Sequence, residues 1–147
     1  MATQYATTQD FIQAFGEQEA IQLSNLDDAL GEVVDAVHMD QALQDASEEV
    51  NSYVRSRYQT PIIDPPRALK RWVLDIARYL LHRYDPTDVV TKNYEAALKF
   101  LREVRDGKKA IDLAATTQEP INSVGAPETF AIDEQSAEPF GDLRGYR

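Results

Sequence analysis

The segment YQTPIIDPPRALKRW, residues 58–72, holds three of the chain's seven prolines, at positions 61, 65 and 66. Each proline fixes its own φ near about −65° and disfavours a helical conformation for the residue before it. A helix must therefore end before Thr60. Asp64 is the expected N-cap of the next helix, with Pro65 and Pro66 in a first turn whose amides need no helical partner. The segment thus predicts two helices joined by a stiff corner.

Apolar residues before this corner repeat with helical spacing. The sequence therefore predicts a long helix that begins at about Asp35 and ends near Tyr58. Steps of four and three residues place five apolar side chains on one of its faces: Met39, Leu43, Ala46, Val50 and Tyr53.

Nearer the N-terminus the same pattern is shorter. Thr7 or Thr8 is the expected N-cap of a short helix that ends at Gly16. Ile21 and Leu23 continue its apolar side in a second short helical turn. Residues 24–35 mix turn formers with apolar residues, and we expect them to form a connecting loop.

The helix expected after the corner is apolar on most of its circumference. Its polar stripe is narrow, and we therefore predict a central helix with neighbours on two sides. The stripe consists of Arg67, Arg71, Asp75, Arg78 and His82.

A last helix is expected after Pro86, with Thr87 as its N-cap and Gly107 at its end. The whole pattern predicts an all-α domain over residues 1–113, a small bundle of three long helices with short N-terminal helical turns. Its expected core contains Val50, Tyr53, Trp72, Ile76, Leu80, Leu98 and Leu101.

Residues 114–147 differ in composition, with three prolines, three glycines and no helical periodicity. We expect this segment not to fold by itself. Regularly placed apolar residues predict an extended C-terminal arm that docks on a partner, although an acidic tail that serves only solubility is the alternative. The predicted anchors are Phe130, Ile132, Phe140, Leu143 and Tyr146.

The net charge of −10 is unevenly distributed. Residues 1–54 hold 11 acids and no Lys or Arg, residues 55–113 hold 8 acids and 13 bases, and residues 114–147 hold 6 acids and 2 bases. An acidic face of one copy could meet a basic face of another, whereas the alternative is that water covers both faces. The predicted contacts between subunits are Arg55, Arg57, Arg67 and Arg71.

Composition also limits the chemistry. Because the chain has no cysteine, disulfides and thiolate zinc sites are excluded. His38 and His82 lack a metal-ligand spacing, and adjacent Glu48 and Glu49 point about 100° apart on a helix, so they cannot converge on one substrate atom. We therefore expect no enzyme, metal or cofactor, and neither a signal peptide nor a membrane span.

The basic run at Arg67, Lys70 and Arg71 beside Trp72 raises the question of nucleic-acid binding. Trp72 lies on the apolar stripe, however, and Asp75 is placed to pair with both Arg71 and Arg78. The net charge also repels DNA. We expect no direct, sequence-specific DNA binding.

Four ordered motifs carry a family resemblance. They are F-x-x-x-[FY]-G at 11–16, D-A-x-x-x-[IV]-x-x-Y at 45–53, R-Y-x-x-P at 57–61 and D-I-A-R-Y at 75–79. Over about residues 5–110 the chain resembles the head-completion or head-tail adaptor proteins of Mu-like tailed phages. The loop at 24–35 lacks the D-x-D-G turn of that pattern, and the arm lies outside the resemblance.

This resemblance implies a homo-oligomeric ring of about twelve subunits at the head-tail junction of the virion, assembled in the host cytoplasm. The ring would contact the portal protein on one side and a stopper or tail-completion protein on the other. DNA would pass through its lumen. A small acidic DNA mimic or regulatory binding module is the alternative, and it accounts for the net charge but not for the ordered motifs.

Overall fold

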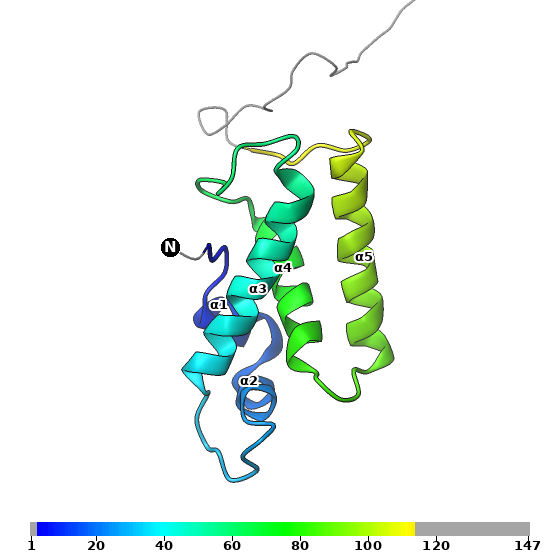
Figure 1. Cartoon of the computed structure of the whole chain (residues 1–147). Coiled ribbons are helices and arrows are strands. Elements are labelled where there is room, and N and C mark those ends of the chain that lie inside the picture. Colours follow the sequence, from blue (N-terminus) through cyan, green and yellow to red (C-terminus); the bar gives the residue numbers. More distant parts are fainter. Residues whose placement is uncertain (1–2, 114–147) are drawn as a thin grey trace, which may run out of the picture.

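The computed structural model describes residues 3–113, whose regular elements are five α-helices (Figure 1). They are α1 (Thr8–Phe15), α2 (Glu17–Ser24), α3 (Ala36–Val54), α4 (Arg67–Leu81) and α5 (Asp88–Arg105). The predicted all-α fold is confirmed. The arm predicted at residues 114–147 lies outside the described residues. Within residues 3–113, no helix has the length and apolar character needed to cross a membrane.

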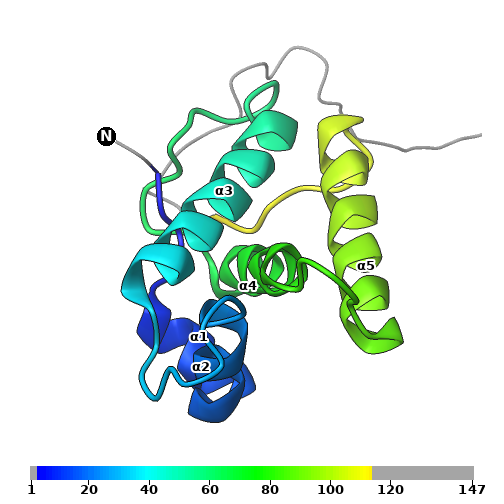
Figure 2. The same cartoon turned by 60° about the horizontal axis from the view of Figure 1, so that its bottom comes forward.

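The three long helices run alternately up and down (Figure 1), and α4 packs against both α3 and α5. Figure 2 shows α4 between these two helices, with the short α1 and α2 gathered beside α3 and α4. Leu69, Val73 and Ile76 of α4 are completely buried. The central position predicted for this helix therefore agrees with its nearly continuous apolar surface.

The core consists mainly of aliphatic side chains from the three long helices. Of the seven core residues predicted above, four are buried and three are partly buried against them. Two aromatic pairs join α4 to α5. The ring centroids of Trp72 and Phe100 lie 4.0 Å apart, and those of the stacked Tyr79 and Tyr94 lie 3.9 Å apart. The apolar spacing thus correctly identified the buried faces.

Side-chain caps fix most helix starts. Thr7 and Asp10 form a capping box at α1, Asp35 accepts two backbone N–H groups at α3, and Thr87 accepts one at α5. Gly16, at φ 100°, separates α1 from α2, and its conformation favours glycine. These boundaries agree with the sequence-based predictions.

The end of α3 differs from its prediction. The helix stops at Val54 rather than near Tyr58. Residues 55–57 form turns, and the buried Tyr58 accepts a hydrogen bond at its hydroxyl from the backbone N–H of Ile111, 3.0 Å away. This tertiary contact ties the segment after α5 to the end of α3, and the local pattern gave no sign of it.

The prediction that Asp64 is an N-cap is wrong. Asp64 has φ 55°, in the left-handed region that aspartate tolerates, and the N-cap of α4 is Pro66. Pro65 itself precedes a proline, so a helical conformation is disfavoured there as well. The helix therefore cannot begin before the second proline of the pair. The Thr60–Pro61 peptide is cis.

A buried tyrosine holds the corner to the bundle. The hydroxyl of Tyr5 donates to Oδ1 of Asn51 (2.5 Å) and accepts from the N–H of Ile62 (2.8 Å). The Tyr5 N–H donates to Oγ of Ser47 at 2.9 Å. One side chain thus links the N-terminal segment, α3 and the corner, so hydrogen bonds as well as prolines determine the corner's path.

Candidate functional site

The two ends of the bundle carry opposite charge. The loop between α2 and α3 lies at one end, and the α3–α4 corner and the residues after α5 lie at the other (Figure 1). Residues 17–35, the acidic end, hold six acids and no Lys or Arg, whereas residues 55–67 and 102–113, the basic end, hold seven bases and four acids. The formal charges of these ranges are therefore −6 and +3, not counting Arg78 and Arg83, which pair with two acids of the acidic end. The acids of the acidic end are Glu17, Glu19, Asp27, Asp28, Glu32 and Asp35.

The acidic end also exposes apolar side chains. Leu30, Val33 and Val37 are 86%, 74% and 78% exposed. Single exposed apolar residues are normal on protein surfaces, but three within eight positions form a candidate contact surface. An acidic rim beside this patch favours a partner that offers positive charge.

Two ion pairs connect the acidic end to the region where α4 ends. The guanidinium of Arg78 binds both carboxylate oxygens of Glu19, with Nη2 3.0 Å from Oε1, and Arg83 Nη2 lies 2.8 Å from Asp27 Oδ2. The predicted pairing of Asp75 with Arg78 is therefore wrong. Arg78 prefers Glu19 because that carboxylate receives both arms of the guanidinium fork.

The four arginines predicted to contact neighbouring subunits fall into two places. Arg55 and Arg57 lie just after α3 at the basic end, where Arg55 Nε donates to the Asn51 carbonyl at 3.2 Å and the Arg57 guanidinium lies against Gly107. Arg67 and Arg71 lie on α4. Arg55 and Arg57 thus lie near the C-terminal end of α5, whereas Arg67 and Arg71 line the side of α4 next to α1.

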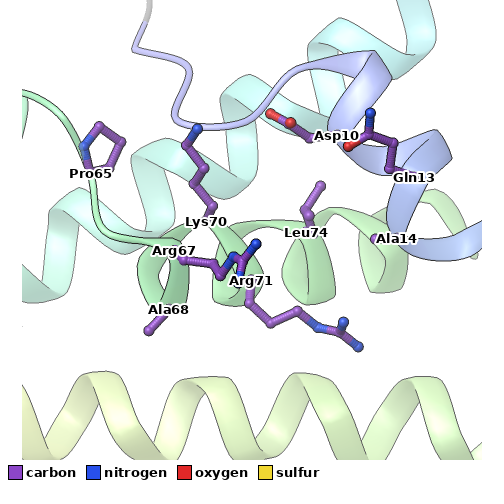
Figure 3. A pocket seen from close by; sticks show the side chains of 9 residues that line it. All are labelled: Asp10, Gln13, Ala14, Pro65, Arg67, Ala68, Lys70, Arg71 and Leu74. Carbon is purple, nitrogen blue, oxygen red and sulfur yellow. The ribbon is translucent and has the colours of Figure 1, made fainter.

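A groove of about 760 Å³ runs between α1 and the first half of α4 (Figure 3). Arg67, Lys70 and Arg71 project from α4, and Asp10 and Gln13 come from α1 on the other side. Its remaining lining is apolar: Ala14, Pro65, Ala68 and Leu74. A second hollow shares Asp10, Pro65 and Lys70 and continues the groove toward the N-terminal segment.

The groove has more positive charge than the described residues neutralise. Arg67 and Lys70 make no side-chain hydrogen bond or ion pair within residues 3–113. Arg71 Nε lies 3.4 Å from Asp75 Oδ2, and the carboxylate of Asp10 is engaged in the α1 capping box. Sequence reasoning identified Arg67 and Arg71 as contact residues but did not place Lys70 with them in a groove, because the groove needs α1 beside α4.

Titratable side chains show no catalytic arrangement in the described part of the chain. His38 pairs with Asp35 at 2.9 Å, while His82 is half-buried, and burial lowers its pKa. Burial likewise raises the pKa of Asp75, with Arg71 opposing the shift. No cluster of three or more potential metal-ligating side chains occurs in residues 3–113.

The family model described as "Bacteriophage Mu, Gp36" matches residues 5–127, which include all five helices and the groove. The chain belongs to this gp36 family. It is 31% identical over 110 residues to the "Mu-like prophage FluMu protein gp36" of Haemophilus influenzae, which covers 75% of this chain and 77% of that relative. It is 34% identical over 104 residues to "Gene product J" of Escherichia phage Mu, covering 71% and 73%.

The predicted kinship with Mu-like phage proteins is thus confirmed. The gp36 family match stops at residue 127, so the last twenty residues, 128–147, lie beyond it. All five predicted anchors of the arm fall in that stretch. The groove and both charged ends lie within the region that the family shares.

Proposed function

We propose that this gp36-family protein is a structural head-tail adaptor, or head-completion protein, of a Mu-like tailed phage, and not an enzyme. About twelve copies form a ring beneath the portal and join the DNA-filled head to the tail. The portal protein is the partner above, and a stopper or tail-completion protein is the partner below. DNA passes through the lumen without sequence-specific contacts, and the protein is part of the virion after assembly in the host cytoplasm.

The observation that supports a ring best is the opposite charge of the two ends. A ring needs two different, complementary surfaces on every subunit, since each copy binds its neighbour head to tail. The acidic end offers carboxylates around Leu30, Val33 and Val37, and the basic end offers Arg55 and Arg57. Contact between the two would join charges of opposite sign and cover the exposed apolar patch.

A rigid subunit is the second requirement of this proposal, because each interface must rotate the next copy by the same angle for the ring to close. The hydrogen bonds of Tyr5 and Tyr58 fix both the corner and the segment after α5 to α3. These contacts favour a wedge of constant shape.

Phage assembly without the protein tests this function. We expect filled heads and free tails that fail to join, with normal particles restored when the purified full chain is added to the extract. Electron microscopy and infectivity titre measure both. Tailed, infectious particles formed at normal yield without the protein would refute the adaptor role.

The alternative, an acidic DNA mimic, is favoured only by the net charge of −10. A mimic presents an acidic surface, whereas the described residues also gather bases at the basic end and in the groove. The two functions differ in size in solution: a mimic would bind basic DNA-binding proteins as a small species, and an adaptor would assemble on purified portal rings.

A further inference from the structure

The groove between α1 and α4 contains positive charge and an apolar lining, but no side chain of residues 3–113 fills it. Arg67 and Lys70 have no acidic partner in that range, and Arg71 has only the long contact with Asp75. An extended acidic segment with apolar side chains has the chemistry that complements such a surface.

The same chain contains such a segment. Residues 128–143 hold five acids and no Lys or Arg, together with Phe130, Ile132, Phe140 and Leu143. The groove residues lie within the gp36 family match, whereas this segment begins just after it. The acids are Glu128, Asp133, Glu134, Glu138 and Asp142.

The last described residues, from which this segment follows through a connection, lie at the end of the bundle where α3 ends. The hydrogen bond from Ile111 to Tyr58 holds the last described residues beside the end of α3. The corner that leads from α3 into α4 lies at the same end (Figure 1), and Pro65 of this corner lines the groove. Residues 114–127 then form a connection of fourteen residues.

The connection is long enough. Fourteen residues span at most roughly 46–50 Å when fully extended, and about 20 Å on average as a random chain. α3, with 19 residues, is about 28 Å long. A tether of this length holds the segment near the groove at an effective concentration on the order of millimolar.

We propose that residues 128–143 bind in the α1–α4 groove of their own chain, with carboxylates beside Arg67, Lys70 and Arg71 and aromatic rings over Pro65, Ala68 and Leu74. The free subunit thereby covers its own basic groove until assembly offers a competing partner. The contact in the groove does not depend on the proposed adaptor function, whereas its release on assembly rests on that function.

Because the chain has no cysteine, a single engineered cysteine can carry a spin label without interference. Ala68→Cys places the label on an exposed position of the groove, and Lys92→Cys places it on α5, outside the groove. In the full-length, ¹⁵N-labelled protein, we expect the label at 68 to remove most of the amide signal of residues 128–143. The label at 92 should leave these signals intact.

Charge variants supply the second measurement. Arg67→Glu together with Lys70→Glu should restore the lost signals, whereas the matched pair Arg55→Glu and Arg57→Glu, outside the groove, should not. An unchanged amide spectrum of the helices checks that each variant is folded. Mixing spin-labelled, unenriched protein with ¹⁵N-labelled, unmodified protein should cause no loss, because the contact is within one chain.

Three results would overturn the proposal. Equal effects of the labels at 68 and 92 would mean that the segment makes no preferred contact with the groove. Signal loss in the mixed sample would assign the groove to the segment of a second copy. Binding of a duplex oligonucleotide to the groove, with no contact from residues 128–143, would assign it to phosphate instead.

Discussion

Asp75 places a carboxylate on the buried side of α4, where its Oδ1 has no hydrogen-bond partner among the described residues. Its other oxygen receives only the long contact from Arg71, which is itself half exposed. A buried charge with incomplete hydrogen bonding destabilises the folded state. Burial accordingly raises the pKa of Asp75.

We expect Asp75→Asn to stabilise the protein by about 1 kcal/mol at pH 7, because a neutral amide is less costly to bury than a carboxylate. Urea unfolding followed by circular dichroism measures the change. Glu95→Gln, which removes an exposed acid from α5, is the matched control and should have no effect. A destabilising Asp75→Asn would mean that the ion pair with Arg71 outweighs the burial.

The difference between wild type and Asp75→Asn should depend on pH. Because the folded-state pKa of Asp75 is raised, ionisation lowers stability as pH increases from the unfolded value of about 3.8 through the folded value. The penalty is complete above the folded pKa and absent below 3.8. The gain from the substitution should therefore shrink as the pH of the unfolding experiment is lowered.

Tyr5 is the residue on which the corner depends most. We expect Tyr5→Phe to destabilise the protein by about 1–3 kcal/mol, because the buried Ile62 N–H and Asn51 Oδ1 lose their partner. Chemical denaturation measures the loss, and Tyr84→Phe, at an exposed tyrosine, is the control. A loss no larger than that of the control would show that the prolines alone hold the corner.

At the scale of helices, α4 is the central helix of the core. Ile76 is completely buried on α4, the helix that lies between α3 and α5. We expect Ile76→Ala to cost about 2–5 kcal/mol, because the packed neighbours cannot collapse fully into the cavity. Val89→Ala, at an exposed position of α5, should cost far less in the same unfolding experiment. A loss under about 0.5 kcal/mol at Ile76 would place this face outside the core.

The helices themselves were predictable because spacing of apolar residues and caps are local signals. Asp35, Thr87 and Gly16 are all where these signals placed them. One error was local, because the N-cap predicted at Asp64 overlooked that Pro65 itself precedes a proline. The other errors arose where longer-range contacts decide: the buried Tyr58 accepts a hydrogen bond from Ile111, and Tyr5 reaches Ile62 across 57 positions. No window of a few residues contains such information.

The candidate site was predictable to a smaller extent. Charge counting along the chain anticipated an acidic first half and a basic middle, and the fold converts this into two opposite ends. The groove, by contrast, exists only because α1 packs beside α4, far apart in sequence. The sequence therefore predicted Arg67 and Arg71 as contact residues, but it did not predict the groove that they share with Lys70.

At the scale of the whole molecule, the two charged ends predict how assembly responds to salt. Ring formation on purified portal should weaken as ionic strength rises, since salt screens contacts between exposed charges. The double variant Arg55→Glu and Arg57→Glu should assemble poorly at low salt. Lys92→Glu, on α5 outside the basic end, is the control. Unchanged assembly of the double variant, measured by electron microscopy, would exclude the basic end from the interface.

The last prediction concerns the C-terminal arm predicted at residues 114–147. Ile111 is the last buried residue within residues 3–113, and a chain cut after Leu113 keeps every core contact described above. Ordering the remaining 34 residues costs backbone entropy of about 1–2 kcal/mol per residue, so a binding surface must compensate, which is the groove in the free subunit and a partner surface in the particle. Phe130, Phe140 and Tyr146 can each bury roughly 150–250 Å² there.

We therefore expect a phage that carries the truncation after Leu113 to accumulate filled heads without tails, because in the proposed adaptor the arm docks on the portal or an adjacent subunit of the particle. Phe140→Ala and Tyr146→Ala should give milder losses of infectious titre. Circular dichroism of the truncated protein should still show the folded bundle, which separates lost docking from lost folding. Tailed, infectious particles at normal yield from the truncation would leave the arm as no more than an acidic tail that aids solubility.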